Sequence, residues 1–187
     1  MTIALIVIAA LIVLAVLYYI VARNSIIASR NRVDESWSGI DVQLKRRHDL
    51  VPNLVESVKG YATHERQVFE KVTEARAAAM AAQGVGETSQ AEGRLTGMLG
   101  DLRAVAENYP DLRATENFQQ LMRQLSELED EIQASRRIYN SNTQSYNTKI
   151  QQFPTSIIAN QGNFVAREFF EIEDAAERAT PQVSFSQ

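Results

Sequence analysis

Residues 33–79 read VDESWSGIDVQLKRRHDLVPNLVESVKGYATHERQVFEKVTEARAAA, and one set of positions in this stretch recurs at alternating steps of four and three residues. Such spacing is typical of a helix that packs along its length against other helices. Only Arg47 and Glu65 interrupt the apolar character of this seam. The stretch therefore predicts long packed helices, and it indicates no reaction. The seam consists of Val33, Trp37, Ile40, Leu44, Arg47, Val51, Leu54, Val58, Tyr61, Glu65, Val68, Val72, Ala75 and Ala79.

An uncharged run from Ile3 to Ala22 precedes the seam. As a helix it spans about 30 Å, which is the hydrocarbon thickness of a bilayer. Tyr18 and Tyr19 lie near its end, where aromatic rings favour the membrane interface, and Arg23 closes it. A cleaved signal peptide is the alternative, but the basic region that should precede it is missing and the apolar run is too long. We therefore predict an uncleaved transmembrane helix.

The charges that flank this run predict an orientation. Arg23, Arg30 and Arg32 follow the run, whereas only two uncharged residues precede it. The positive-inside rule then places the C-terminal domain in the cytoplasm, with a very short N-terminus outside.

Composition narrows the function classes further. The chain has 187 residues with 8 Gly and 4 Pro, which suits long helices and disfavours a turn-rich β fold. Its net charge of -4 gives no general reason to expect nucleic-acid binding. The absence of cysteine excludes thiol catalysis, thiolate metal sites and disulfides.

The seam keeps its phase across Pro52, so we expect one long helix, bent at this proline, as far as about Ala82. Residues 83–88 are predicted to form a loop before a second helix at about 89–107, in which Gly93, Gly97 and Gly100 would let a neighbouring helix approach closely. Tyr109 and Pro110 end that helix. The connector 108–116 is expected to run back along the bundle, because the second helix is much shorter than the first.

A second seam predicts a helix at about 117–153. Tyr139, Asn142 and Tyr146 lie in its polar second half; Asn142 either fixes the helix register or marks a wetter end of the bundle. Phe153 and Pro154 end this helix, and apolar residues between 157 and 170 are expected to form a short final helix. The predicted fold is thus all-α: an N-terminal transmembrane helix followed by an elongated antiparallel four-helix bundle with coiled-coil-like seams. The predicted parts are an anchor and connector at 1–29, the bundle at 30–172 and a polar tail at 173–187.

Three clusters of polar residues are candidate sites. Asp34, Asp41 and His48 share one helix stripe, but steps of seven residues put them about 10.5 Å apart, so a solvated face is favoured over a metal site. The basic residues 45–47 lie too far from the membrane for a lipid patch if the helix is straight, so Arg47 is expected to cover the seam and pair with carboxylates. The Arg136-Arg137 pair beside two tyrosines is assigned to packing rather than to nucleic acid. No catalytic motif is recognisable, so the prediction is a non-enzymatic protein without cofactor or metal.

Residues 30–61, RNRVDESWSGIDVQLKRRHDLVPNLVESVKGY, resemble the signature block of the LemA family. Further family positions follow in order at 109–112, 136–140, 146–147 and 153–154. The positions that carry the resemblance and the packing are Asn31, Val33, Asp34, Trp37, Ile40, Asp41, Leu44, Arg47, His48, Pro52, Asn53, Leu54, Tyr109, Pro110, Tyr139, Asn142, Tyr146, Phe153 and Pro154.

The resemblance implies a bacterial, single-pass protein of the inner membrane with an antiparallel four-helix bundle and no generally agreed activity. Relatives in this family are often encoded near membrane metallopeptidases or TPM-domain proteins, so the resemblance implies such a protein as a partner. Ala4, Ala15 and Ala22 share one face of the anchor, where small residues can support helix association. We therefore expect a membrane-anchored scaffold that forms a homo-oligomer and serves envelope organisation. The alternative is a monomeric adaptor that recruits a peptidase or another envelope protein through its bundle surface.

Overall fold

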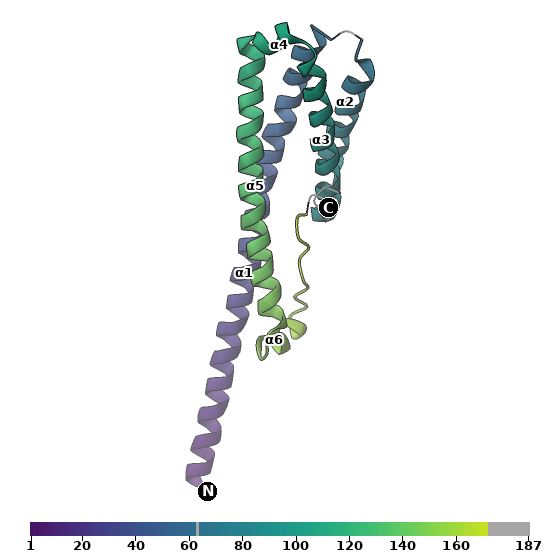
Figure 1. The fold of residues 1–187 in the computed structure, drawn as a ribbon. Helices are drawn as coiled ribbons and strands as arrows, with labels where there is room; N and C mark the ends of the chain where they lie inside the picture. Colours follow the sequence, from purple (N-terminus) through teal and green to yellow (C-terminus); the bar gives the residue numbers. More distant parts are fainter. Residues whose placement is uncertain (63, 172–187) are drawn as a thin grey trace, which may run out of the picture. The chain divides into compact units, whose positions relative to one another are not determined.

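The computed structural model describes residues 1–62 and 64–171, and these residues form six helices and no strand. The prediction of an all-α helical bundle is confirmed. The predicted tail at 173–187, and Ile172 at the end of the predicted bundle, lie outside the described residues. The helices are α1 (Thr2–Lys59), α2 (Arg66–Ala81), α3 (Gly84–Glu107), α4 (Pro110–Ala114), α5 (Glu116–Gln151) and α6 (Thr155–Gln161) (Figure 1).

The chain divides into two compact units, each of which contains a part of α1 and a part of α5. The first unit comprises residues 1–41 and 134–168, and the second comprises residues 42–133 and 169–187. The predicted boundaries at 29/30 and 172/173 stay predictions, although α1 runs without interruption through the first of them.

The core of the second unit is built from four helices and closed by α4. Apolar side chains from the C-terminal part of α1, from α2 and α3, and from the N-terminal part of α5 share one cluster. Burial of such surface is the main favourable term in folding, at about 25 cal/mol per Å². The most deeply buried members are Val51, Leu54, Val58, Ala62, Val72, Leu95, Leu102, Ala106 and Leu112.

The expectation of one helix from residue 33 to about 82 is wrong. The helix does continue through Pro52, but it ends at Lys59, and α2 starts only at Arg66. Gly60 follows the last helical residue, a position where glycine commonly ends a helix. The apolar phase survives the break because both helices face the same core, so the seam could not reveal the turn.

Two further connections differ from the sequence prediction. The predicted loop at 83–88 is short, because Gly84 adopts a φ of +76° and already begins α3. The connector after α3 is not extended, because Pro110 starts the five-residue helix α4. No long return is needed, since the break after Lys59 makes α1 and α2 two shorter antiparallel partners.

The first unit contains the predicted membrane anchor. Within the described residues α1 is the helix that is long and apolar enough to cross a membrane, with a mean hydropathy of 3.0 over its most apolar window of 18 residues, none of them buried. Beyond the anchor α1 packs with α5, and α6 follows as the short final helix. Residues 162–168 continue without helix, so the apolar residues from Phe164 onward do not extend the final helix as expected.

Candidate functional site

A buried ionic cluster in the second unit is centred on Arg47 of α1. Its guanidinium donates to Glu92 of α3 through Nη2, and its Nη1 donates to Glu129 Oε1 of α5 at 2.6 Å and to Thr96 Oγ1 at 3.1 Å. The side chains of Arg47 and Glu92 are both 0% exposed. A seam position that should hold an apolar residue therefore ties three helices together by charge-assisted hydrogen bonds.

His48 adds a second contact to the same carboxylate, with 2.7 Å between its Nε2 and Glu92 Oε1. Burial by itself raises the pKa of Glu92, but the hydrogen bond from His48 and the charges of Arg47 and His48 outweigh burial, so the pKa lies below its ordinary value of 4.5. The prediction that His48 lies on a solvated face is wrong, since its side chain is buried in this cluster. Asp34 and Asp41, its companions in the stripe, are exposed.

The cluster is built to hold helices rather than to react. Each carboxylate faces a cation, and such mutual pairing leaves no lone base aimed at a substrate. Within the residues that the structure describes, no group of His, Asp or Glu is placed to hold a metal ion.

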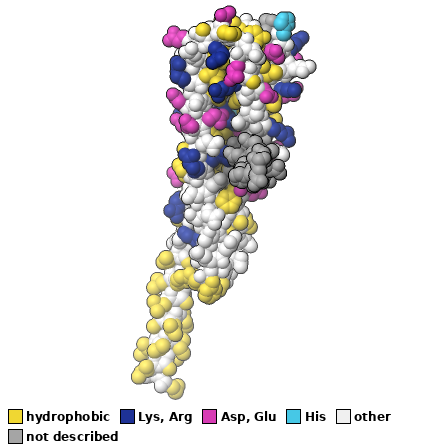
Figure 2. Space-filling model, viewed as in Figure 1, with side chains coloured by type: hydrophobic (Ala, Val, Ile, Leu, Met, Phe, Trp, Pro, Cys, Tyr) yellow, Lys and Arg dark blue, Asp and Glu magenta, His cyan; other side chains and the backbone are white. Residues whose placement is uncertain are grey.

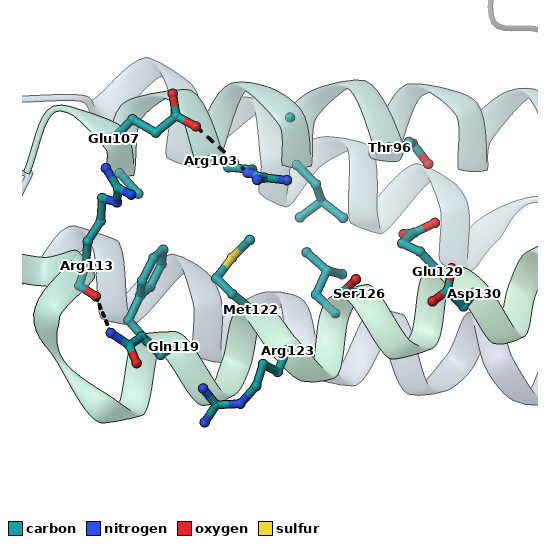
Figure 3. A pocket seen from close by; sticks show the side chains of 15 residues that line it. Thr96, Arg103, Glu107, Arg113, Gln119, Met122, Arg123, Ser126, Glu129 and Asp130 are labelled. Carbon is teal, nitrogen blue, oxygen red and sulfur yellow. Dashed lines mark hydrogen bonds and ion pairs between the residues drawn. The ribbon is translucent and has the colours of Figure 1, made fainter.

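An open groove between α3 and α5 begins at this cluster, and Thr96 and Glu129 belong to both (Figure 3). Its volume is about 780 Å³. Apolar side chains, among them Phe118 and Met122, form its floor. Charged side chains of both signs line its rim, namely Arg103, Glu107, Arg113, Arg123, Glu129 and Asp130. This composition suits an amphipathic protein surface better than a small polar substrate.

Gly97 and Gly100 lie beside this groove on α3. A Cβ atom built at either position meets nothing within 4 Å, so no helix among the described residues packs closely there, and the close approach of a neighbouring helix stays a prediction. The exposed Gly100 lines the groove itself. The small-residue face of α3 is therefore open.

A second constellation, in the first unit, fixes residues 162–168 along α5. The Tyr139 hydroxyl donates to the Glu168 carbonyl at 2.8 Å, and the Tyr146 hydroxyl donates to the Val165 carbonyl at 3.0 Å. Burial raises the pKa of both phenols above 10.0. Buried hydroxyls that donate to backbone carbonyls are structural hydrogen bonds, so this constellation carries no chemistry of its own.

The remaining family positions are divided between core and surface. Val33, Ile40, Leu44 and Leu54 are buried, Trp37 and Tyr109 are half-buried, and the Trp37 ring lies 5.5 Å from that of Tyr139. The exposed family positions are Asn31, Pro52, Asn53, Pro110, Phe153 and Pro154. In the anchor, Ala22 is buried, and the exposed positions are Ile3, Ala4, Ala15, Tyr18, Tyr19 and Arg23.

Asn142 donates from Nδ2 to the Arg32 carbonyl on α1 at 3.4 Å. This contact with the neighbouring helix agrees with the register-fixing alternative, although Asn142 is only half-buried. Two turns further along α5, Lys149 Nζ lies 2.6 Å from Ser29 Oγ and 3.0 Å from Ser25 Oγ.

Sequence reasoning missed the partners of Arg47. Glu92 was readable, because it lies three, seven and ten residues before Leu95, Leu99 and Leu102 and so shares their apolar face of α3. A charge in that position indicates a buried partner. Glu129 carries no such signal, since α5 has many exposed carboxylates around it.

Comparisons with known proteins agree with the motif. The model of the LemA family matches residues 36–185. Protein LemA of Metamycoplasma hominis is 31% identical over 143 residues, which cover 75% of this chain and 65% of that protein. Magnetosome protein MamQ 2 of Paramagnetospirillum magneticum is 26% identical over 96% of this chain and 77% of its own length. Magnetosome protein MamQ of Magnetospirillum gryphiswaldense is 23% identical over 86% of this chain and 69% of its own length. With its apolar N-terminal helix, its helical bundle and its signature block, the chain is a membrane-associated helical protein that belongs to the LemA family.

Proposed function

We propose that the protein is a non-enzymatic scaffold that is anchored in the bacterial inner membrane and self-associates through its helical bundle to organise the cell envelope. Its ionic cluster is internally paired, and its groove has an apolar floor. None of the relatives described above has a name that refers to a reaction. These observations support an interaction surface rather than a catalytic centre.

The groove between α3 and α5 carries this proposal. Its rim holds Arg103, Arg113 and Arg123, and it also holds Glu107, Glu129 and Asp130. Glu129 pairs with Arg47, and Glu107 pairs with Arg103 on the same helix, whereas Arg113, Arg123 and Asp130 also line the groove. A surface that carries both cations and anions can pair with a copy of itself across a two-fold axis, because the cations of one copy then face the anions of the other.

The neighbouring open face of α3 favours the same occupant. Gly97 and Gly100 allow another helix to approach the backbone of α3 closely. No helix in the described ranges 1–62 and 64–171 uses this space, which leaves it to a second copy.

The orientation in this proposal rests on charge. Arg23, Arg30 and Arg32 follow the apolar run, which supports a cytoplasmic bundle and a short N-terminus outside. A cysteine-reactive reagent that cannot cross membranes tests it on intact cells, because the chain has no cysteine of its own. A cysteine at the exposed Gly39 should react only after the membrane is opened, and reaction in intact cells would reverse the orientation.

The oligomeric state of the full-length protein in nanodiscs or detergent tests self-association. Gly100→Trp adds a bulky ring to the lining of the groove at a position where an added Cβ meets nothing within 4 Å, and Gly39→Trp is a matched control on α1, where an added Cβ also meets nothing within 4 Å. We expect mass photometry to show concentration-dependent oligomers that Gly100→Trp weakens and Gly39→Trp leaves unchanged. A monomer at every concentration would refute self-association. If that monomer recovered one stoichiometric membrane peptidase or TPM-domain protein, the adaptor function would replace the scaffold.

A further inference from the structure

The membrane-proximal end of the first unit, formed by the end of α5 and by α6, exposes apolar side chains beside the anchor. Phe153 is 81% exposed and Ile157 is 52% exposed, and Val165 is exposed nearby in sequence. Figure 2 shows apolar side chains along the N-terminal half of α1 and again at this end. Isolated exposed apolar residues are common, but a group of them next to a transmembrane helix needs a partner.

The register between α1 and α5 gives the depth of this group. Asn142 contacts the carbonyl of Arg32, and Lys149 contacts Ser25 and Ser29. The two helices therefore run antiparallel, and higher residue numbers on α5 lie beside lower residue numbers on α1. The last helical residue of α5, Gln151, lies about 3 Å beyond Lys149, and Phe153 follows it in the turn before α6. Phe153 is therefore level with about residues 21–25 of α1.

The burial of Ala22 supports this register independently. Ala22 is 8% exposed, whereas residues 1–21 are all exposed. The folded part of the first unit therefore covers α1 as far as the last residue of its apolar run. Because the run from Ile3 to Ala22 fills the hydrocarbon layer, this level is the boundary between acyl chains and headgroups.

Charge at this end suits the same location. Residues 1–30 and 142–166, which form the membrane-proximal part of this unit, contain Arg23, Arg30 and Lys149 and no Asp or Glu, although the whole chain has a net charge of -4. Basic residues at a bilayer surface are attracted by anionic lipids, and carboxylates would be repelled. Arg30, whose guanidinium lies 5.7 Å from the Phe164 ring centroid, belongs to this group.

We propose that the α5–α6 end is a second membrane contact, in which Phe153 and Ile157 insert into the interfacial layer of the bilayer that α1 spans. Aromatic and aliphatic side chains favour this layer when polar groups beside them remain at the surface. Gln152, Thr155 and Ser156 supply such polar groups. The contact fixes the first unit against the membrane at two points, so the bundle cannot pivot freely on α1. It does not depend on self-association.

Depth-dependent quenching in vesicles tests this contact with the full chain. Single cysteines replace Phe153 and Ile157, the two side chains that the proposal places in the membrane. A cysteine at Val21 is the reference for the same depth, and a cysteine at the exposed Ile138, which comes earlier in α5 and lies further from the membrane, is the matched apolar control. Each carries an environment-sensitive dye in phosphatidylcholine–phosphatidylglycerol vesicles that contain lipids spin-labelled close to the headgroup. The chain has no native cysteine, so each dye reports one site.

We expect the dyes at 153 and 157 to shift to shorter wavelength and to be quenched as strongly as the dye at 21, while the dye at 138 keeps an aqueous spectrum and is not quenched. Equal quenching at 153, 157 and 138 would overturn the proposal. A wavelength shift at 153 without lipid quenching would also overturn it, because it would indicate a protein partner. Both substituted side chains are exposed, and circular dichroism of each labelled variant verifies that it is folded.

Discussion

Pro52 creates a defect in α1 that Arg76 of α2 repairs. A proline has no backbone N–H, so the carbonyl of His48, four residues earlier, loses its helical donor. In the structure Arg76 Nε donates to this carbonyl at 2.6 Å. The contact joins two helices at the point where one of them is weakest.

The cost of removing Arg76 follows from this geometry. A hydrogen bond from a charged donor is worth about 1.5–3 kcal/mol, and a carbonyl left without a partner is penalised further if it is buried. Arg76 is only half-buried, so water can replace part of the bond and the lower end of that range applies. We expect Arg76→Met, which keeps an apolar stem, to lower the free energy of unfolding by about 1.5 kcal/mol.

A double-mutant cycle isolates this contact. Pro52→Ala restores an N–H that can bond the His48 carbonyl within the helix, so Arg76→Met should cost little in that background. We therefore expect a coupling energy of about 1 kcal/mol, read from urea unfolding of the full chain in detergent by circular dichroism. Trp37 fluorescence is a poor probe, because this residue lies in the first unit and the contact lies in the second. Equal costs of Arg76→Met with and without Pro52 would refute the reasoning.

Three further predictions concern buried polar groups. Arg47→Met leaves Glu92 buried without its cation and should lower the free energy of unfolding by about 3–5 kcal/mol in the same assay; adding Glu92→Leu should recover most of that loss. Because the folded state lowers the pKa of Glu92, its contribution is complete above pH 4.5 and is lost as the pH falls through the lowered pKa, so Glu92→Gln should flatten the acid limb of a stability–pH curve. Tyr146→Phe removes the bond to the Val165 carbonyl and should cost about 1 kcal/mol, whereas Tyr61→Phe, at an exposed position, should cost nothing measurable.

The sequence predicted what depends on local periodicity. The apolar N-terminal helix, most of the heptad positions and the helical class follow from spacing and hydropathy, and the structure agrees on these, whereas the seam position Tyr61 is exposed. It could not predict the turn after Lys59, because two antiparallel helices facing one core keep the same apolar phase as one continuous helix. Gly60 was the available signal, and the uninterrupted seam outweighed it.

The candidate site depends on contacts between residues far apart in sequence. Arg47 was expected to pair with carboxylates, and it does, but its partners are 45 and 82 residues away in the chain. Periodicity places a side chain on a face and leaves open which residue of another helix meets it. The open face at Gly97 shows the same limit, since a glycine pattern indicates the close approach of a helix without saying whether that helix belongs to the same chain.

Arg47 also has a role in choosing between alternative packings. Heptad seams permit slips of seven residues, because each slip returns apolar residues to the core. A slip of α1 by one heptad would bring Ile40 or Leu54 to the position of Arg47 and leave Glu92 buried against an aliphatic side chain. An unpaired buried carboxylate costs several kcal/mol, so these registers are excluded even though their apolar burial is similar. The charge in the seam therefore contributes to the uniqueness of the fold more than to its stability. A variant in which both Arg47 and Glu92 are replaced by apolar residues can be stable, but it no longer excludes the slipped registers.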